Sequence, residues 1–211
     1  MTRTLIRRPV WFDVLAYMVP GTPWRRAWAA TRTTQDHADL VIAWLEGRYR
    51  FTTGHMGPPD PETESITAEL VRINAAGLVT TNSQPGVLGA DRHGRFDQRA
   101  YLHAYGPAEL VERVARAAAA AGLWVETDPA LPGCQTMPEH APVTFAPETG
   151  KVWTTARLWN RDSAPMWDSG AVSWHRDSLL AWRTAPMIAV IDPEPGSNRL
   201  WDVVTGALTT A

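Results

Sequence analysis

Twice along the chain, a glycine ends a helical pattern and the next residue, a leucine, opens a strand. The two junctions are Gly77–Leu78 and Gly122–Leu123. Glycine readily adopts the left-handed conformation that closes helices, and the residues after each junction favour a β-strand. Such alternation predicts a sheet covered by helices. The loops beyond the two strands differ, so the pattern indicates ordinary α/β organisation and not an internal repeat.

Two helices are expected before the first junction. The earlier one has capping-box spacing at Thr33 and Asp36, followed by an apolar face. A Gly- and Pro-rich loop over residues 52–60 separates it from the later one. Asp60 is the expected cap of that helix and Pro61 its first residue, because the fixed φ of proline suits a helix start.

The rest of the chain contains further strands and two more helices. A Gly-rich loop is expected over residues 86–94, and residues 100–105 alternate as a strand does. The other elements are expected as a helix from Pro107, strands at 123–127, 171–174 and 187–191, a hairpin pairing 143–145 with 152–155, and a closing helix capped by Ser197 or Asn198. The fold class is therefore α+β or α/β, with a mixed sheet, helices packed on it and one hairpin.

Length and composition fit one domain. The chain has 211 residues, of which 45% are hydrophobic and 20% charged, so a packed core is expected. We expect an N-terminal arm over residues 1–23 and a single domain over residues 24–211. The net charge of −2 gives no strong attraction to nucleic acid or to an anionic membrane, so neither is an expected partner.

Cysteine and arginine usage give indications about the compartment. Cys134 is the single cysteine, which excludes an internal disulfide and a Cys-rich zinc site, and a cytoplasmic location is expected. Lys151 is the only lysine, a bias typical of GC-rich genomes. Arginines precede an apolar stretch over residues 10–19, as in a signal peptide, but Asp13 interrupts it and no clear cleavage site follows.

The first candidate site is the polar segment over residues 80–84, which we expect to be a turn at the end of a strand. There Thr81, Asn82 and Gln84 are candidate substrate-binding residues, and Ser83 is a candidate catalytic residue. Loops at strand ends often carry binding groups. The alternative is that these side chains bond only to local backbone within a tight turn.

The second candidate site lies on the strand over residues 100–105. Arg99, Tyr101 and His103 would share one face, because side chains in a strand repeat every second residue. Arg99 would bind an anion bidentately with Tyr101 beside it, and His103 would move a proton. The alternative is a solvated sheet face without a catalytic role.

The third candidate is Asp192, a catalytic carboxylate expected just past the buried strand and close to Glu194. Its alternative role is to end the strand at a turn. Weaker signals are Cys134 as a nucleophile with His140 nearby, and the pairs His175–Asp177 and Asp36–His37, neither of which forms a recognisable metal array. No dinucleotide fingerprint, Walker loop or nucleophile elbow is present, so no cofactor and no metal is indicated.

Several segments have a familiar pattern: Trp44–Gly47, Pro59–Thr63, the Asn74–Gly86 segment with its T-x-x-S-Q-P-G pattern, Gln98–Ala100 and Val190–Pro193. In these segments the central third of the chain resembles a family of uncharacterised proteins from Streptomyces and related actinobacteria. The resemblance implies a bacterial host, supplies no catalytic residues, and favours a joint role for the segments around Gln84 and Arg99.

These features lead to two hypotheses of different classes. The first is a small soluble enzyme, a hydrolase or group transferase that acts on a polar or anionic small molecule. The second is a non-catalytic ligand-binding or protein-interaction module with a role in regulation or phage conflict. The sequence leaves a monomer and a homo-oligomer both open.

Overall fold

The computed structural model describes residue 19 and residues 21–53, 55–91, 94–156, 158 and 175–209. The expected strand over residues 171–174, most of the expected N-terminal arm, and Arg92 and His93 lie outside these ranges.

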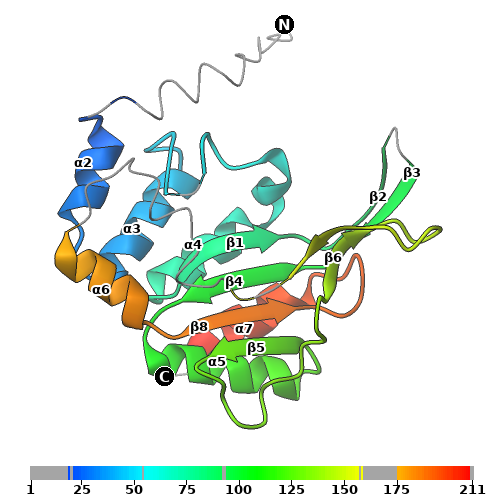
Figure 1. The fold of residues 1–211 in the computed structure, drawn as a ribbon. Helices are drawn as coiled ribbons and strands as arrows, with labels where there is room; N and C mark the ends of the chain where they lie inside the picture. The colour runs from blue at the N-terminus through cyan, green and yellow to red at the C-terminus, as the bar shows by residue number, and fades with distance from the viewer. Residues whose placement is uncertain are drawn as a thin grey trace, which may run out of the picture.

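A four-stranded antiparallel sheet forms the centre of the fold (Figure 1). Its strand order is β1-β4-β8-β5, so β1 and β5 are the edges. A second four-stranded sheet has the order β2-β3-β6-β7. The strands are β1 Val79–Gln84, β2 Val87–Asp91, β3 Gly94–Gln98, β4 Tyr101–Tyr105, β5 Trp124–Asp128, β6 Pro142–Phe145, β7 Val152–Thr155 and β8 Met187–Ile191.

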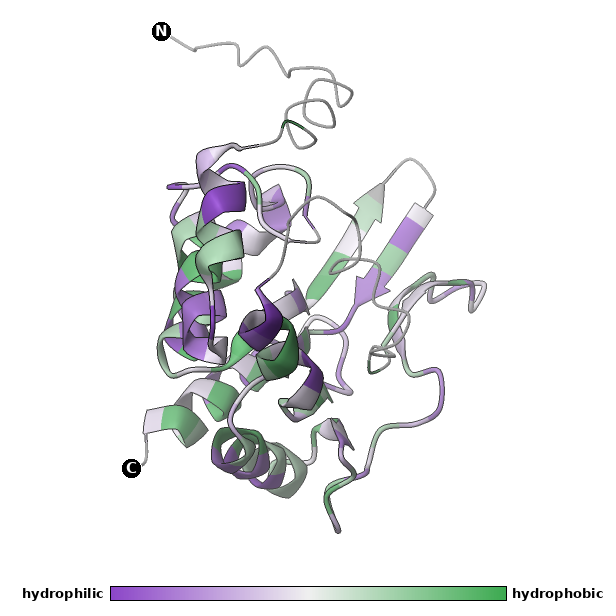
Figure 2. Cartoon of the chain, turned by 60° about the vertical axis from the view of Figure 1, so that its left-hand side comes forward, coloured by the Kyte–Doolittle hydropathy of each residue, from purple (hydrophilic) through white to green (hydrophobic). Residues whose placement is uncertain are grey.

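Helices pack on one face of the central sheet. They are α2 Pro23–Ala30, α3 Thr34–Leu45, the 3₁₀ helix η1 Pro61–Ile66, α4 Thr67–Ala75, α5 Ala108–Ala120, α6 Arg176–Thr184 and α7 Arg199–Thr209. Figure 1 shows α2, α3 and α6 gathered near one end of the sheet, with α5 and α7 along it. Figure 2 shows hydrophobic and hydrophilic residues sharing these helices, as expected for helices with one buried face. The expected α+β fold, with strands, helices packed on them and a hairpin, is confirmed. The expected mixed sheet is wrong in one respect, because every pairing of described strands is antiparallel.

The two faces of the central sheet pack against different partners. Leu102 and Val190 pair across β4 and β8 and belong to the large core that also contains residues of α4, α5 and α7. Tyr101 and Ile191 pair on the opposite face and belong to a smaller cluster with Val143 and its neighbours. Both faces are therefore covered, and β4 and β8 are buried along their whole length.

Local signals in the sequence set several of these boundaries. Thr33 and Asp36 form the expected capping box of α3. Gly77 and Gly122 both have positive φ and end α4 and α5, as expected. The hairpin β6–β7 is also confirmed. Asp60 occupies the expected N-cap position of η1 and Pro61 is its first residue, but the Asp60 side chain makes no capping bond.

Two expectations about loops are wrong. The polar segment that ends at Gln84 is not a turn but most of strand β1, which pairs with β4. The supposed Gly-rich loop over residues 86–94 contains β2 and the start of β3, a second hairpin. In both cases hydrogen bonds to a partner strand satisfy the backbone, and this outweighs the turn preference of Asn, Ser and Gly.

Candidate functional site

A cavity of about 110 Å³ lies against the edge strand β1, and we call it the β1 pocket. Cavities that bind drug-sized ligands are about 300–1,000 Å³, so this one suits a small molecule or one group of a larger one. It is lined by Trp28, Val41, Trp44, Leu45, Thr52, Thr53, His55, Asp60, Thr63, Leu70 and residues 79–83.

Three of the expected site residues lie in this pocket. Thr81, Asn82 and Ser83 line it, together with the preceding residue of β1, Thr80. A run of consecutive strand residues in one wall indicates that the cavity faces the edge of the strand, because side chains on one face of a strand come from alternate residues. The pocket therefore meets the backbone of β1 as well as its side chains.

The register of β1 shows which backbone groups point to the free edge. The Thr80 N–H donates to the Asn74 side chain at 3.1 Å, so it points away from β4. Thr80 lies opposite Ala104, and Ser83 lies opposite Leu102, two residues along β4. Antiparallel pairs alternate between bonded and non-bonded. The Ser83 N–H and C=O therefore also point away from β4, towards the edge where the pocket lies.

His103 lies behind the pocket and does not line it. The residue is fully buried on β4, and its ring Nδ1 contacts the Thr81 hydroxyl, which also lies 3.2 Å from the His103 carbonyl oxygen. Because a carbonyl can only accept, both contacts are satisfied when the hydroxyl donates to the carbonyl and the ring N–H donates to the hydroxyl. Burial lowers the pKa of His103 to about 3, so the ring is neutral near pH 7. In this structure His103 positions Thr81.

A second imidazole, His55, does line the pocket. Its Nε2 lies 3.0 Å from the Pro58 carbonyl oxygen. A carbonyl only accepts, so Nε2 carries the proton and the basic lone pair is on Nδ1. The ring also lies against the Trp44 indole, with centroids 5.1 Å apart. Trp44 itself donates through Nε1 to the Gly57 carbonyl at 2.8 Å, so both rings are anchored to the same loop.

Asp192 is fully buried at the end of β8 and does not line the β1 pocket. Its Oδ2 accepts a 2.6 Å hydrogen bond from the Ser197 hydroxyl, and its Oδ1 lies 3.3 Å from the Arg199 Nε. The backbone N–H of Glu194 donates to Oδ1 as well. The carboxylate thus shapes the turn that leads into α7, which is the alternative role considered for it above.

Arg99 is held at a distance from Ser83. Its Nε donates to the Pro193 carbonyl at 2.9 Å and its Nη1 to the Pro142 carbonyl at 2.8 Å. The guanidinium lies over the rings of Trp124 and Phe145. Trp124 belongs to β5, the edge opposite β1, so the structure does not bring Arg99 to the β1 pocket. Burial lowers the pKa of Arg99, an effect that the nearby Asp97 opposes.

Gln84 and Tyr101 also lie elsewhere. The Gln84 Oε1 accepts from the Thr144 hydroxyl at 3.3 Å, and the same hydroxyl lies 3.2 Å from the Gln98 Oε1. Tyr101 is buried in the smaller core cluster beneath the second sheet. Neither residue lines the β1 pocket.

Two of the segments that carry the family resemblance, those around Gln84 and Gln98, meet at a structural junction. The Gln98 side chain donates to the Pro85 carbonyl at 2.9 Å. The Asn198 amide accepts from the Gly86 N–H at 2.8 Å and donates to the Gly86 carbonyl at 3.0 Å. These bonds join the end of β1, the end of β3 and the turn before α7. The expected joint role of the two segments therefore has a structural basis here.

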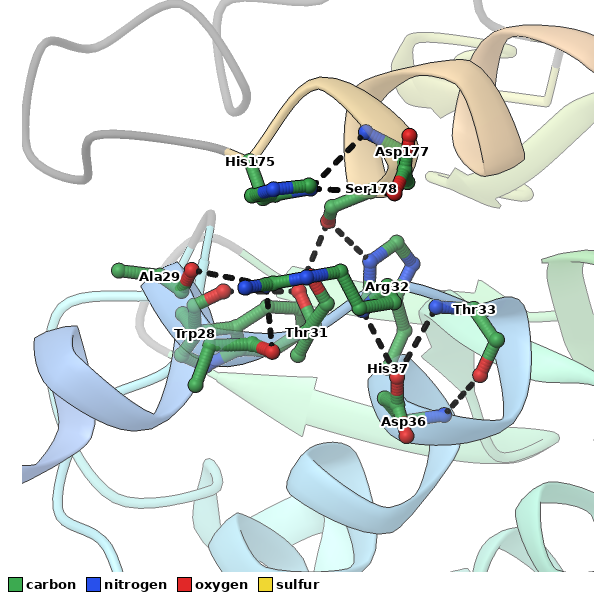
Figure 3. Close-up of polar contacts among 11 residues, drawn as sticks. Trp28, Ala29, Thr31, Arg32, Thr33, Asp36, His37, His175, Asp177 and Ser178 are labelled. Atoms are coloured by element: carbon green, nitrogen blue, oxygen red, sulfur yellow. Dashed lines mark hydrogen bonds and ion pairs between the residues drawn. The ribbon is translucent and has the colours of Figure 1, made fainter.

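A buried chain of polar side chains lies behind Trp28, one of the pocket residues. His37 contacts the Tyr105 hydroxyl through Nδ1 at 2.8 Å and the Ser178 hydroxyl through Nε2 at 2.7 Å. Ser178 also contacts the Thr31 hydroxyl at 2.7 Å (Figure 3). Burial lowers the pKa of His37 to about 4, against a smaller opposite effect of Asp36. The chain ties α6 to α2, α3 and β4.

The weaker signals in the sequence do not gather into a site. Cys134 is buried, whereas His140 is exposed. His175 pairs with Asp177 at 3.4 Å on the surface of α6 (Figure 3). Within the part of the chain that the structure describes, no three His, Cys, Asp or Glu side chains are grouped so as to hold a metal ion.

Among the described residues, no helix is long and apolar enough to cross a membrane.

Sequence reasoning did not assign His55 and Asp60 to the site. Both come from the Gly- and Pro-rich loop before η1, which was expected only to connect two helices. The signal available was the density of polar side chains in that loop, from Thr52 to Asp60. Local sequence does not reveal that this loop folds back onto β1, since the contact joins residues more than 20 positions apart.

The fold and the pocket define an α+β protein with a polar cavity at the edge of its central sheet. The chain belongs to the family described as "Domain of unknown function (DUF6919)", whose model matches residues 23–211. No curated protein matches the chain.

Proposed function

We propose that this protein is an enzyme that binds a polar small molecule in the β1 pocket and catalyses hydrolysis or group transfer. The observation that carries the proposal is that one cavity gathers Ser83 and Asn82 from β1 with His55 and Asp60 from a distant loop. A hydroxyl, an imidazole and a carboxylate are side chains that such enzymes use for nucleophilic and acid–base steps.

In this proposal each lining group has one role. His55, with Nε2–H fixed on the Pro58 carbonyl, accepts a proton at Nδ1. The nucleophile is the Ser83 hydroxyl or a water molecule activated by His55. The Asn82 amide orients the ligand, and Thr81, whose hydroxyl is bonded to His103, lines the cavity beside it. The proton-transfer role first considered for His103 and Asp192 passes to His55, because His103 and Asp192 are fully buried and do not line the cavity.

The test is a thermal-shift screen of a metabolite library, followed by NMR detection of turnover for each compound that binds. His55→Asn is expected to lower kcat by about 10²- to 10⁴-fold and leave the melting temperature close to that of the wild type. His140→Asn is the matched control, because His140 is exposed, lies outside the pocket and has a positive φ that asparagine tolerates. Equal turnover in the His55→Asn and wild-type proteins would refute the assignment of His55.

A second candidate function is a non-catalytic interaction module. The observation that favours it is the exposed apolar surface of the second sheet, where Trp153 on β7 is 42% exposed and Leu88 on β2 is 63% exposed. Binding of a library compound in the β1 pocket without any turnover would support this candidate.

The source we propose is the cytoplasm of an actinobacterium, in keeping with the near absence of lysine.

A further inference from the structure

We infer that the ligand of the β1 pocket is an uncharged, polyhydroxylated ring, as found in sugars and cyclitols. The inference rests on the proposed function, because it names the ligand class of the same site. Its first support is the charge of the cavity. Among the described lining residues none is Arg or Lys, and Asp60 is the only carboxylate. An anion held there would lie near the Asp60 carboxylate with no Arg or Lys among the described lining residues to pair with it, and juxtaposed like charges are unfavourable.

The second support is the number of hydroxyl groups in the wall. A hydroxyl both donates and accepts, so a wall of hydroxyls matches the alcohol groups of a polyol in several orientations. The lining residues that carry a hydroxyl come from three separate segments, the loop after α3, η1 and β1. They are Thr52, Thr53, Thr63, Thr80, Thr81 and Ser83. The Thr80 hydroxyl accepts from the Asn74 amide and the Thr81 hydroxyl is bonded to His103, so these two are already engaged within the protein. The Ser83 backbone N–H and C=O, which point to the free edge of β1, add one donor and one acceptor.

One of these hydroxyls has no partner in the part of the chain that the structure describes. Thr52 is 6% exposed, and its buried Oγ1 makes no hydrogen bond to a described residue. A buried polar atom without a partner is costly, and proteins retain such atoms mainly where a ligand or water will satisfy them. Rotation about the Cα–Cβ bond of Thr52 redirects this hydroxyl, so a ligand hydroxyl in the cavity can complete its bonding.

The third support is an anchored aromatic surface. The Trp44 indole lines the cavity, is half-buried, and is fixed by its Nε1 bond to Gly57 and its contact with the His55 ring. The C–H face of a sugar ring is apolar and packs on an aromatic face, while its hydroxyls bond around the rim. The exposed Asp60 carboxylate, which makes no capping bond, is available to accept from such hydroxyls.

The experiment compares neutral rings with their anionic analogues. The neutral rings are D-glucose and myo-inositol, and the anionic analogues are their phosphate monoesters. Binding of each to the full chain is measured by saturation-transfer NMR and calorimetry. Concentrations reach about 10 mM, which detects ligands with a millimolar Kd. We expect at least one neutral ring to bind and its phosphate ester to bind no more tightly. Tighter binding of either ester, or no binding of either neutral ring, overturns the inference.

Variants locate the binding. Thr52→Val keeps the shape of the side chain and removes its hydroxyl, and Trp44→Leu removes the aromatic surface. Each is expected to weaken binding by about tenfold or more, which corresponds to one good interaction. Thr154→Val on the exposed strand β7 is the matched control and is expected to bind as the wild type does. Unchanged affinity in both pocket variants contradicts the inference.

The outcomes separate the ligand class from the proposed function. An anionic compound whose binding depends on Ser83 and His55 would contradict the polyol inference and leave the proposed function standing. A neutral ring that binds at the pocket without turnover would support the ligand class and contradict the enzymatic proposal.

Discussion

The change of Gly86 to alanine tests the junction that holds the end of β1 in place. A Cβ at this position would lie 2.0 Å from the Ser197 carbonyl oxygen and 2.8 Å from its carbon, both backbone atoms. To relieve the clash, the two segments must separate, which breaks both hydrogen bonds between Asn198 and the Gly86 backbone. Overpacking costs about 1–3 kcal/mol, and each lost bond costs about 1 kcal/mol. We therefore expect Gly86→Ala to lower the free energy of unfolding by about 3–5 kcal/mol.

The assay is urea unfolding followed by circular dichroism, with thermal unfolding alongside. A loss of this size lowers the melting temperature by about 6–20 °C in a chain of this length. Gly206→Ala is the matched control, because a Cβ at Gly206 meets no atom within 4 Å and the residue lies inside helix α7. That change is expected to stabilise the protein by up to about 1 kcal/mol. A Gly86→Ala protein within about 0.5 kcal/mol of the wild type would refute the argument.

Three further predictions follow from buried and half-buried polar groups. The pKa values of His37 and His103 fall from the ordinary 6.5 to about 4 and about 3, so the unfolded chain binds more protons below pH 6.5. The free energy of unfolding should therefore fall by about 2 kcal/mol per histidine between pH 7 and pH 5. Urea titrations at the two pH values should show a smaller fall for the His103→Gln protein. Arg99→Lys should lower the free energy of unfolding by about 1–2 kcal/mol, because lysine lacks the planar guanidinium fork. Calorimetry should show unchanged ligand affinity, since Arg99 lies away from the β1 pocket. Weaker ligand binding would show that Arg99 belongs to the binding site. Ser178→Ala should cost about 1–3 kcal/mol by leaving His37 without one of its partners; an unchanged urea midpoint would show that the buried chain does not hold α6.

Much of the fold could be predicted because the signals are local. The capping box at Thr33 depends on residues three positions apart, and the glycines at 77 and 122 act through their own backbone conformation. The apolar run over 187–191 is buried along its length, as expected. These features need no distant partner, so the sequence displays them directly.

The strand β1 shows where local signals fail. Its residues Thr81, Asn82, Ser83 and Gln84 have the composition of a turn, yet they form a strand because β4 lies beside them and pairs with them. The same holds for β2, whose Gly-rich sequence pairs with β3. A pairing partner elsewhere in the chain can therefore override local preference.

The candidate site divides in the same way. The polar side chains of Thr81, Asn82 and Ser83, and the strand they follow, predicted that these residues lie at a potential site. The packing of distant segments decided that His55 lines the same pocket and that Arg99 lies towards the opposite edge of the sheet.

The sequence by itself determined where α3 begins, where α4 and α5 end and where the buried strand β8 lies, because caps, glycines and apolar runs act over a few residues. Only the tertiary structure decided which polar side chains share a cavity. The loop at residue 55 and the strand at residue 83 come together because the whole core buries its apolar surface. That burial depends on residues far apart in the chain, so no short stretch of sequence predicts it.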